Sequence, residues 1–143
     1  KVEHHKGEIS FPGGAHDPTD PDLSYTALRE AHEEVGLHPG DVEVLGEIDE
    51  FVTVSNFRVT PFVGLIRRTP YEWAPAVDEV ANVLEVPVER LLSPDVFKQE
   101  YIEHRGQWYN HLTYTWEGHV VWGATATMLT QFLDLLRQHG LEL

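Results

Sequence analysis

Three glutamates lie close together in the sequence, at positions Glu30, Glu33 and Glu34. Their spacing of i, i+3 and i+4 places them on one face of a helix, with Cβ atoms about 5–6 Å apart. At an effective dielectric constant near 20, two like charges about 5 Å apart repel by about 3 kcal/mol, and in bulk water by less than about 1 kcal/mol. The glutamates therefore form either a solvated acidic face or, inside a cleft, a site that needs a cation.

The tetrapeptide Phe11-Pro12-Gly13-Gly14 precedes these glutamates in the chain. Paired glycines permit a tight turn and a close approach of the backbone to other groups. A glycine carbonyl exposed in this turn would add one more oxygen to the three carboxylates. Hard oxygen ligands of this kind suit Mg²⁺ or Mn²⁺.

The element that carries the glutamates is predicted to be a helix from about Pro21 to Val35. Asp20 is expected to be its N-cap and Pro21 its first helical residue. Gly36 is expected to end it. A stripe of apolar residues repeats every four positions and predicts the buried face: Leu23, Ala27, Ala31 and Val35.

The rest of the chain alternates strand-like and helical patterns. Strands are predicted over Val42–Thr53, Phe57–Ile66 and Asn82–Val86, and a hairpin over Tyr101–His104 and Gln107–Trp116, turning at Arg105-Gly106. Helices are predicted over Val88–Leu92 and Gly123–His139. Strands mixed with two long helices indicate a sheet covered by helices.

The segment around the glutamates resembles the signature of the Nudix hydrolase family, G-x5-E-x7-R-E-U-x-E-E-x-G-U, where U is a bulky apolar residue. The second half is intact, with Arg29-Glu30, Glu33-Glu34 and Gly36-Leu37, and Ala31 at the first U. The first half departs from it. Counted from Gly14, the glutamate position holds Asp20, and one additional residue then precedes Arg29.

A narrower resemblance links the chain to the coenzyme A diphosphatase branch of this family. That branch carries G-x3-F-P-G-G before the signature, and this chain has the same pattern from Gly7 to Gly14. Glu3 stands where the branch usually has an arginine. Further segments are also similar to the branch: Val59–Gly64, Asp78–Val80 and Val121–Ala126.

The resemblance implies an α+β fold of the Nudix type. This fold is an α/β/α sandwich with a central mixed β-sheet and a loop-helix-loop catalytic motif. It would occupy residues 1–143 as a single domain, with its N-terminal strand missing from a chain that opens at Lys1.

The resemblance also implies roles for site residues. The implied ligands of Mg²⁺ or Mn²⁺ are Glu30, Glu33, Glu34 and the carbonyl of Gly13. Arg29 would orient a carboxylate of the signature through a bidentate pair. The general base is Glu33 or Glu79, and Glu79 could instead be an additional ligand.

The implied reaction is metal-dependent hydrolysis of the diphosphate bond of coenzyme A or its derivatives, giving 3′,5′-ADP and 4′-phosphopantetheine. One alternative is a Nudix enzyme for another nucleoside diphosphate derivative, such as ADP-ribose, a dinucleoside polyphosphate or a dNTP. A second is a non-catalytic nucleotide-binding Nudix module, and a third is an acidic interaction domain without a ligand. Four arginines are candidates for the 3′-phosphate of coenzyme A: Arg58, Arg67, Arg68 and Arg105.

The resemblance implies a small-molecule nucleotide as the partner, and composition bears on the other classes of partner. Ten Lys and Arg against 24 Asp and Glu give a net charge of −14, which argues against nucleic acid as a partner. No apolar run is long enough to span a membrane. The sequence contains no Cys, so thiolate chemistry and disulfides are excluded. A cytoplasmic location is the default expectation, and the sequence is compatible with a homodimer without fixing the oligomeric state.

Overall fold

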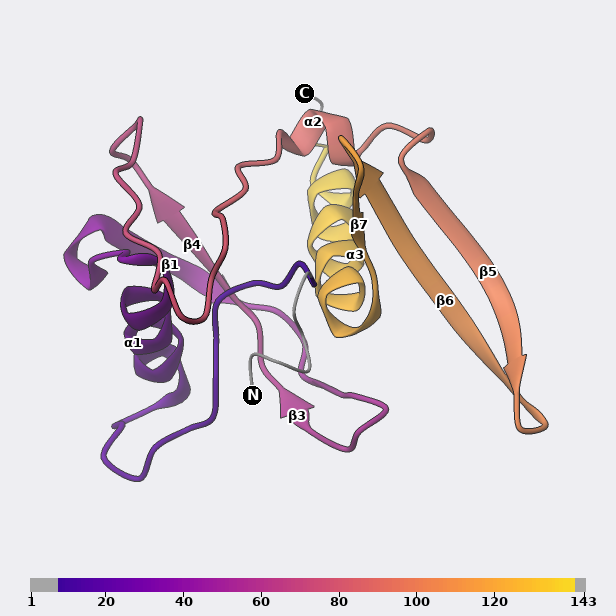
Figure 1. The fold of residues 1–143 in the computed structure, drawn as a ribbon, viewed down its shortest axis with the longest axis horizontal. Helices are drawn as coiled ribbons and strands as arrows, with labels where there is room; N and C mark the ends of the chain where they lie inside the picture. The colour runs from indigo at the N-terminus through magenta and orange to yellow at the C-terminus, as the bar shows by residue number, and fades with distance from the viewer. Residues whose placement is uncertain (1–7, 141–143) are drawn as a thin grey trace. The chain divides into compact units, whose positions relative to one another are not determined.

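The computed structural model describes residues 8–140, which form two compact units (Figure 1). Unit 1 comprises residues 11–84, and unit 2 comprises residues 8–10 together with 85–140. The glycine loop (Phe11–Gly14), the three glutamates at positions 30, 33 and 34, and Glu79 all belong to unit 1.

Unit 1 contains a long helix, a 3₁₀ turn and four strands. They are α1 (Leu23–Val35), η2 (Pro39–Asp41), β1 (Val42–Glu47), β2 (Phe51–Val52), β3 (Arg58–Val59) and β4 (Phe62–Ile66). β1 pairs antiparallel with β4, and β2 pairs antiparallel with β3. The buried core of this unit consists of Ala31, Val35 and Leu37, against which residues of β1 and β4 pack.

The ends of α1 differ in part from the prediction. The N-cap is Asp22, whose side chain accepts a hydrogen bond from the Tyr25 backbone N–H, so the assignment of Asp20 as the cap was wrong. Gly36 ends the helix as predicted, in the left-handed conformation with φ of 76°. This conformation favours glycine because a Cβ is strained there.

The buried face of α1 is shorter than the predicted stripe. Ala31 and Val35 are buried as expected, whereas Leu23 is 46% exposed. Thr26 is buried in addition, at 4% exposure. The first turn of α1 therefore buries a hydroxyl group instead of the leucine that the periodicity predicted.

The predicted strands of unit 1 are interrupted in the structure. Val42–Thr53 is divided into β1 and β2, and Phe57–Ile66 into β3 and β4. Pro61 lies between β3 and β4 and has no N–H to donate to a ladder. Its carbonyl instead accepts a hydrogen bond of 2.8 Å from the Ile48 N–H. The strand predicted over Asn82–Val86 is not formed.

Unit 2 contains two helices and a three-stranded antiparallel sheet. They are α2 (Val88–Leu91), β5 (Phe97–His104), β6 (Gln107–Trp116), β7 (His119–Val121) and α3 (Gly123–Gln138). The predicted hairpin is confirmed, and Arg105 and Gly106 turn it with positive φ angles of 53° and 80°. The core of unit 2 includes Tyr114, Ala126 and Leu133.

The α+β class is confirmed, while the arrangement of strands differs from the expected single mixed sheet. Within residues 8–140 the strands form three separate sheets, and every strand pair is antiparallel. Antiparallel neighbours can be joined by short turns, as β5, β6 and β7 are, whereas a parallel pair needs a long crossover connection.

None of the helices within residues 8–140 is long and apolar enough to cross a membrane.

Candidate active site

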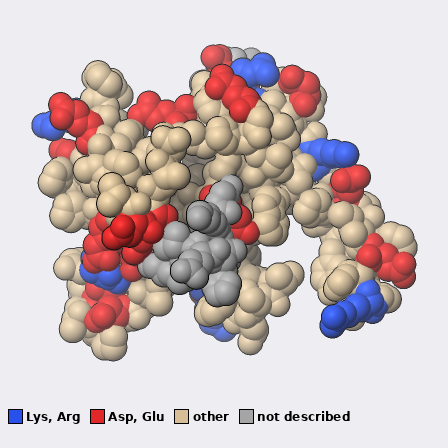
Figure 2. Space-filling model, in the orientation of Figure 1, with Lys and Arg blue, Asp and Glu red and all other residues tan. Residues whose placement is uncertain are grey.

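The glutamates of α1 occupy different environments within unit 1. The side chain of Glu30 is 13% exposed and that of Glu33 is 56% exposed. Glu34 is half-buried. Figure 2 shows acidic side chains in several separate patches on the visible face and basic side chains at fewer places.

The glycine loop lies against these glutamates, as the pairing of Gly13 and Gly14 predicted. The backbone N–H of Gly13 donates a hydrogen bond of 3.0 Å to Oε1 of Glu34. A Cβ on Gly14 would come within 2.5 Å of Cδ and Oε2 of Glu30. Gly14 therefore allows the carboxylate of Glu30 to lie against the loop backbone, and a larger residue would displace that carboxylate. The Gly13 carbonyl as a metal ligand stays a prediction.

Arg29 makes the predicted bidentate pair, and its partner is Asp20. Nε donates to Oδ1 at 3.1 Å and Nη2 donates to Oδ2 at 3.0 Å. The Asp20 side chain is only 1% exposed. The arginine holds the pKa of the Asp20 carboxyl well below its usual range, and the carboxylate in turn raises the pKa of Arg29.

The remaining nitrogen of Arg29 reaches the glutamates. Nη1 lies 3.2 Å from Oε2 of Glu30 and 3.2 Å from Oε2 of Glu33. One guanidinium thus connects a buried aspartate with two carboxylates of the predicted metal site.

Two further groups complete the environment of Asp20, and the sequence reasoning missed both. The Thr26 hydroxyl donates to Oδ2 at 2.7 Å, and the Asp17 N–H donates to Oδ2 at 3.0 Å. The signal available in the sequence was the i, i+3 spacing of Thr26 and Arg29, which places both on one helix face.

Glu79 lies on a turn that is connected to the end of α1. The Ala74 N–H donates to the Val35 carbonyl and the Ala76 N–H to the Glu34 carbonyl, each at 2.9 Å. The Glu79 N–H in turn donates to the Ala76 carbonyl at 2.9 Å. The structure therefore brings the backbone of the Glu79 segment to the helix end that carries Glu34, and the Glu79 side chain is exposed.

The donor chemistry of unit 1 fits a hard divalent cation. Glu30 and Glu34 face the same glycine loop, and Glu33 stands on the same side of α1. In residues 8–140 no three acidic or histidine side chains already converge on one point. Glu30 and Glu33 instead contact Arg29. A cation at this place therefore requires these side chains to rotate away from the arginine.

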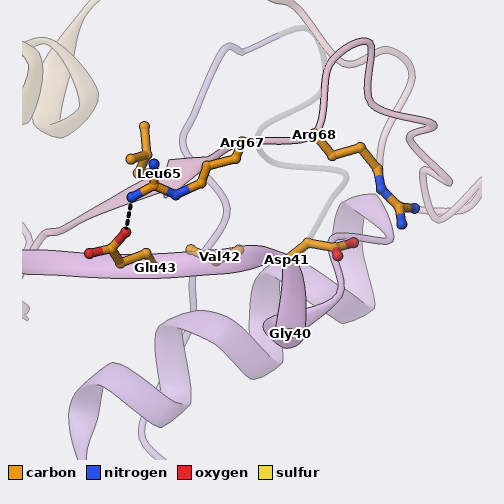
Figure 3. A pocket seen from close by; sticks show the side chains of 7 residues that line it. All are labelled: Gly40, Asp41, Val42, Glu43, Leu65, Arg67 and Arg68. Carbon is orange, nitrogen blue, oxygen red and sulfur yellow. Dashed lines mark hydrogen bonds and ion pairs between the residues drawn. The ribbon is translucent and has the colours of Figure 1, made fainter.

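Three of the arginines considered for phosphate recognition belong to unit 1. Arg58 pairs with Glu50, and Arg67 pairs with Glu43. Arg67 and Arg68 line a surface pocket of about 300 Å³ between η2, β1 and β4. In Figure 3 Arg67 points to Glu43 and Arg68 points away on the side of Asp41, so their cationic groups do not converge.

Three other residues considered in the sequence analysis lie elsewhere. Arg105 is in the β5–β6 turn of unit 2. Glu3 and Gly7, which bear on the coenzyme A resemblance, lie outside the described residues.

A family model and several known proteins are similar to this chain, and all of them are of the Nudix type. The NUDIX domain family model matches residues 2–112. The peroxisomal coenzyme A diphosphatase NUDT7 of Mus musculus is 43% identical over 107 residues, which cover 75% of this chain and 45% of that protein. The uncharacterized Nudix hydrolase NudL of Pectobacterium atrosepticum is 39% identical over 127 residues, which cover 89% of this chain and 66% of that protein. This chain thus spans less than two thirds of either relative.

Proposed function

This chain belongs to the Nudix family of hydrolases, and from that premise we propose that it hydrolyses the diphosphate bond of coenzyme A or a coenzyme A derivative. The products are 3′,5′-ADP and 4′-phosphopantetheine or its acylated form. The oxygen of a water molecule attacks one phosphorus, the bond from that phosphorus to the bridging oxygen breaks, and the proton of the water passes to a carboxylate.

The observation that carries this proposal is the arrangement of α1 against the glycine loop. Gly13 contacts Glu34, and the backbone of Gly14 passes close to Glu30. This arrangement gives the chain a cluster of oxygen donors beside a backbone that can approach a substrate closely. The name of the mouse relative, a coenzyme A diphosphatase, supports coenzyme A as the substrate.

Glu30, Glu33, Glu34 and the Gly13 carbonyl would hold the divalent cation, Mg²⁺ or Mn²⁺. A cation held there would supply charge neutralisation for the anionic diphosphate and would polarise its phosphoryl oxygens. Glu33 or Glu79 accepts the proton of the attacking water. Arg29 orients Glu30 and Glu33 through its Nη1 contacts.

We further propose that residues 1–143 act as one domain on a small-molecule nucleotide, in the cytoplasm, without nucleic acid or membrane as a partner. One alternative is hydrolysis of another nucleoside diphosphate derivative. The same glutamates could act on it, because residues outside α1 select the substrate. A non-catalytic nucleotide-binding module is a further alternative, and the complete set Glu30, Glu33 and Glu34 argues against it.

The test is a substrate panel incubated with Mg²⁺ or Mn²⁺ and analysed by product mass. The panel contains coenzyme A, acetyl-coenzyme A, 3′-dephospho-coenzyme A, ADP-ribose, a dinucleoside polyphosphate and a dNTP. The proposal expects 3′,5′-ADP and phosphopantetheine from coenzyme A, with little turnover of the compounds unrelated to it. Selective cleavage of ADP-ribose or another nucleotide would refute coenzyme A as the substrate, while the chain would still be a Nudix hydrolase. No turnover of any compound would favour the non-catalytic binding module.

A further inference from the structure

Two histidines lie side by side at the C-terminal end of α1. The ring centres of His32 and His38 are 5.0 Å apart, and their ring planes are inclined by 42°. His32 belongs to the last turn of the helix, and His38 comes directly before η2. Both residues are exposed, so a dissolved ion can reach both rings.

The chain between the two histidines is held firmly. The Gly36 N–H donates to the His32 carbonyl at 3.1 Å, and the Leu37 N–H donates to the Ala31 carbonyl at 3.4 Å. Leu37 is also buried, at 8% exposure, in the core that contains Ala31. These hydrogen bonds and the buried side chain fix the direction in which the backbone leaves the helix.

His38 is fixed on its other side as well. Its N–H donates to the Tyr71 hydroxyl at 3.0 Å, and its carbonyl accepts the Asp41 N–H at 2.9 Å. The Tyr71 hydroxyl in turn donates to Oδ2 of Asp41 at 2.7 Å. The backbone of each histidine is therefore set before any ligand binds, which lowers the entropy that is lost when both rings bind one ion.

The separation of the rings matches that of two imidazoles on one tetrahedral metal ion. With a metal–nitrogen distance of about 2.1 Å, each ring centre lies about 3.2 Å from the ion, and two such rings lie about 5.2 Å apart. Rotation of a ring about its Cβ–Cγ bond turns a nitrogen toward the ion and leaves the ring centre nearly in place. Imidazole nitrogen suits Zn²⁺, Cu²⁺ and Ni²⁺, whereas Mg²⁺ prefers oxygen.

We propose that His32 and His38 form a further metal site, which takes a divalent cation of the Zn²⁺ class through one nitrogen of each ring. Water fills the other coordination positions, because within residues 8–140 no three histidine or acidic side chains are gathered in a group that fits a metal ion. The negative end of the α1 dipole, beside His32, favours a cation at this place. This inference does not depend on the proposed function.

The histidine pair lies on a different side of α1 from the glutamates. At about 100° per residue, His32 lies about 160° around the helix from Glu30 and from Glu34. The two sites also differ in chemistry, since one offers carboxylate oxygens and the other offers imidazole nitrogens. A cation at the pair would join the last turn of α1 to the residue before η2 and would stabilise the end of the helix.

The first experiment follows the imidazole nitrogens of the full chain by nuclear magnetic resonance during titration with Zn²⁺ at saturating Mg²⁺. We expect the signals of His32 and His38 to change together, at a lower Zn²⁺ concentration than those of His104 and His139 in unit 2. Titration with Mg²⁺ alone should produce no comparable change at the pair.

Three outcomes of this titration would overturn the proposal. Signals of the pair that stay unchanged with Zn²⁺, or that change one without the other, would refute a shared ion. Equal responses of all four histidines would refute a specific site. A response of the pair to Mg²⁺ as large as that to Zn²⁺ would refute the assignment of the cation class.

The second experiment is calorimetric titration of variants with Zn²⁺, again at saturating Mg²⁺. Loss of a group that only orients a metal ligand already costs about 10–100-fold in affinity, so we expect His38→Ala, which removes a ligand, to raise the Kd at this site at least about 10-fold. His139→Ala is the matched control, because it removes an exposed histidine from the end of α3, and its Kd should stay within about twofold of the wild type. Equal affinities of His38→Ala and the wild type would refute the site, and the resonance measurement on the wild type decides if the variant does not fold.

Discussion

At the scale of single residues, Glu34 connects α1 with the glycine loop directly, because its carboxylate accepts a hydrogen bond from the Gly13 N–H. Replacement by Gln in Glu34→Gln retains the shape and can keep the hydrogen bond from Gly13, but removes one charged oxygen ligand. We expect kcat on coenzyme A to fall at least about 100-fold, with little change in the thermal midpoint. Glu43→Gln is the matched control, because Glu43 is an exposed strand residue paired with Arg67. Equal rates for Glu34→Gln and wild type would contradict the metal role.

Gly14 gives a second prediction at this scale. An alanine there would place its Cβ within 2.5 Å of the Glu30 carboxylate, so that carboxylate must shift. We expect Gly14→Ala to weaken Mn²⁺ binding by about 10-fold. Gly40→Ala serves as the control, since a Cβ on Gly40 meets nothing within 4 Å. Calorimetric titration of both variants measures their affinity for Mn²⁺. An unchanged Mn²⁺ affinity in Gly14→Ala would show that the glycine loop does not constrain Glu30.

The buried carboxylate of Asp20 should make stability depend on acidic pH. Its pKa is lower in the folded protein than the value of about 3.9 in an unfolded chain, chiefly because of the hydrogen bonds from Arg29. The stabilisation is therefore complete above the unfolded pKa and is lost as the pH falls toward the folded pKa. Urea unfolding at about pH 5 and about pH 3 should show lower stability at the acidic value. Asp20→Asn should show a smaller difference between the two, and an equal difference would contradict the assignment.

At the scale of elements, the start of α1 depends on Asp22. Its side chain accepts the Tyr25 N–H, which the helix itself cannot satisfy. We expect Asp22→Ala to lower the free energy of unfolding by about 1 kcal/mol. Ser24→Ala, which removes only a hydroxyl bonded to the same aspartate, should cost less. A destabilisation by Asp22→Ala no larger than that of Ser24→Ala would argue against this cap.

The sequence predicted best those elements whose signals are local. Gly36 marked the end of α1 and Gly106 marked the turn of the hairpin, because glycine adopts a positive φ without steric cost. The β6–β7 turn was missed although Glu117-Gly118 has the same pattern, with φ angles of 47° and 80°. Hydrophobic periodicity alone did not predict β7, because this strand has only three residues.

Other features depend on contacts between distant parts of the chain. Asp20, the predicted helix cap, instead forms a buried pair with Arg29, and Asp22 caps α1. The acidic cluster and the glycine loop were predicted as neighbours, but the N–H of Gly13 at Glu34 could not be read from spacing. Likewise, the backbone hydrogen bonds between the Glu79 segment and the end of α1 join residues that are far apart in the sequence.

At the scale of the whole molecule, the charge balance sets how an anionic substrate approaches. The chain carries a net charge of −14, and coenzyme A is itself a polyanion. Salt screens their repulsion, with a Debye length of about 30 Å at 0.01 M and about 8 Å at 0.15 M ionic strength. At saturating Mg²⁺ we therefore expect kcat/KM for coenzyme A to rise about two- to fivefold over this range. A decrease over the same range would indicate that the substrate is attracted to a local cationic region instead.

We propose that the α1 glutamates take part in a metal-dependent cleavage of coenzyme A. The most direct measurement is the product mass from coenzyme A and Mn²⁺ incubated with the wild type and with Glu34→Gln side by side. We expect 3′,5′-ADP and 4′-phosphopantetheine from the wild type and nearly intact coenzyme A from the variant. Intact coenzyme A in both reactions, or the same products in equal amounts from both, would contradict it.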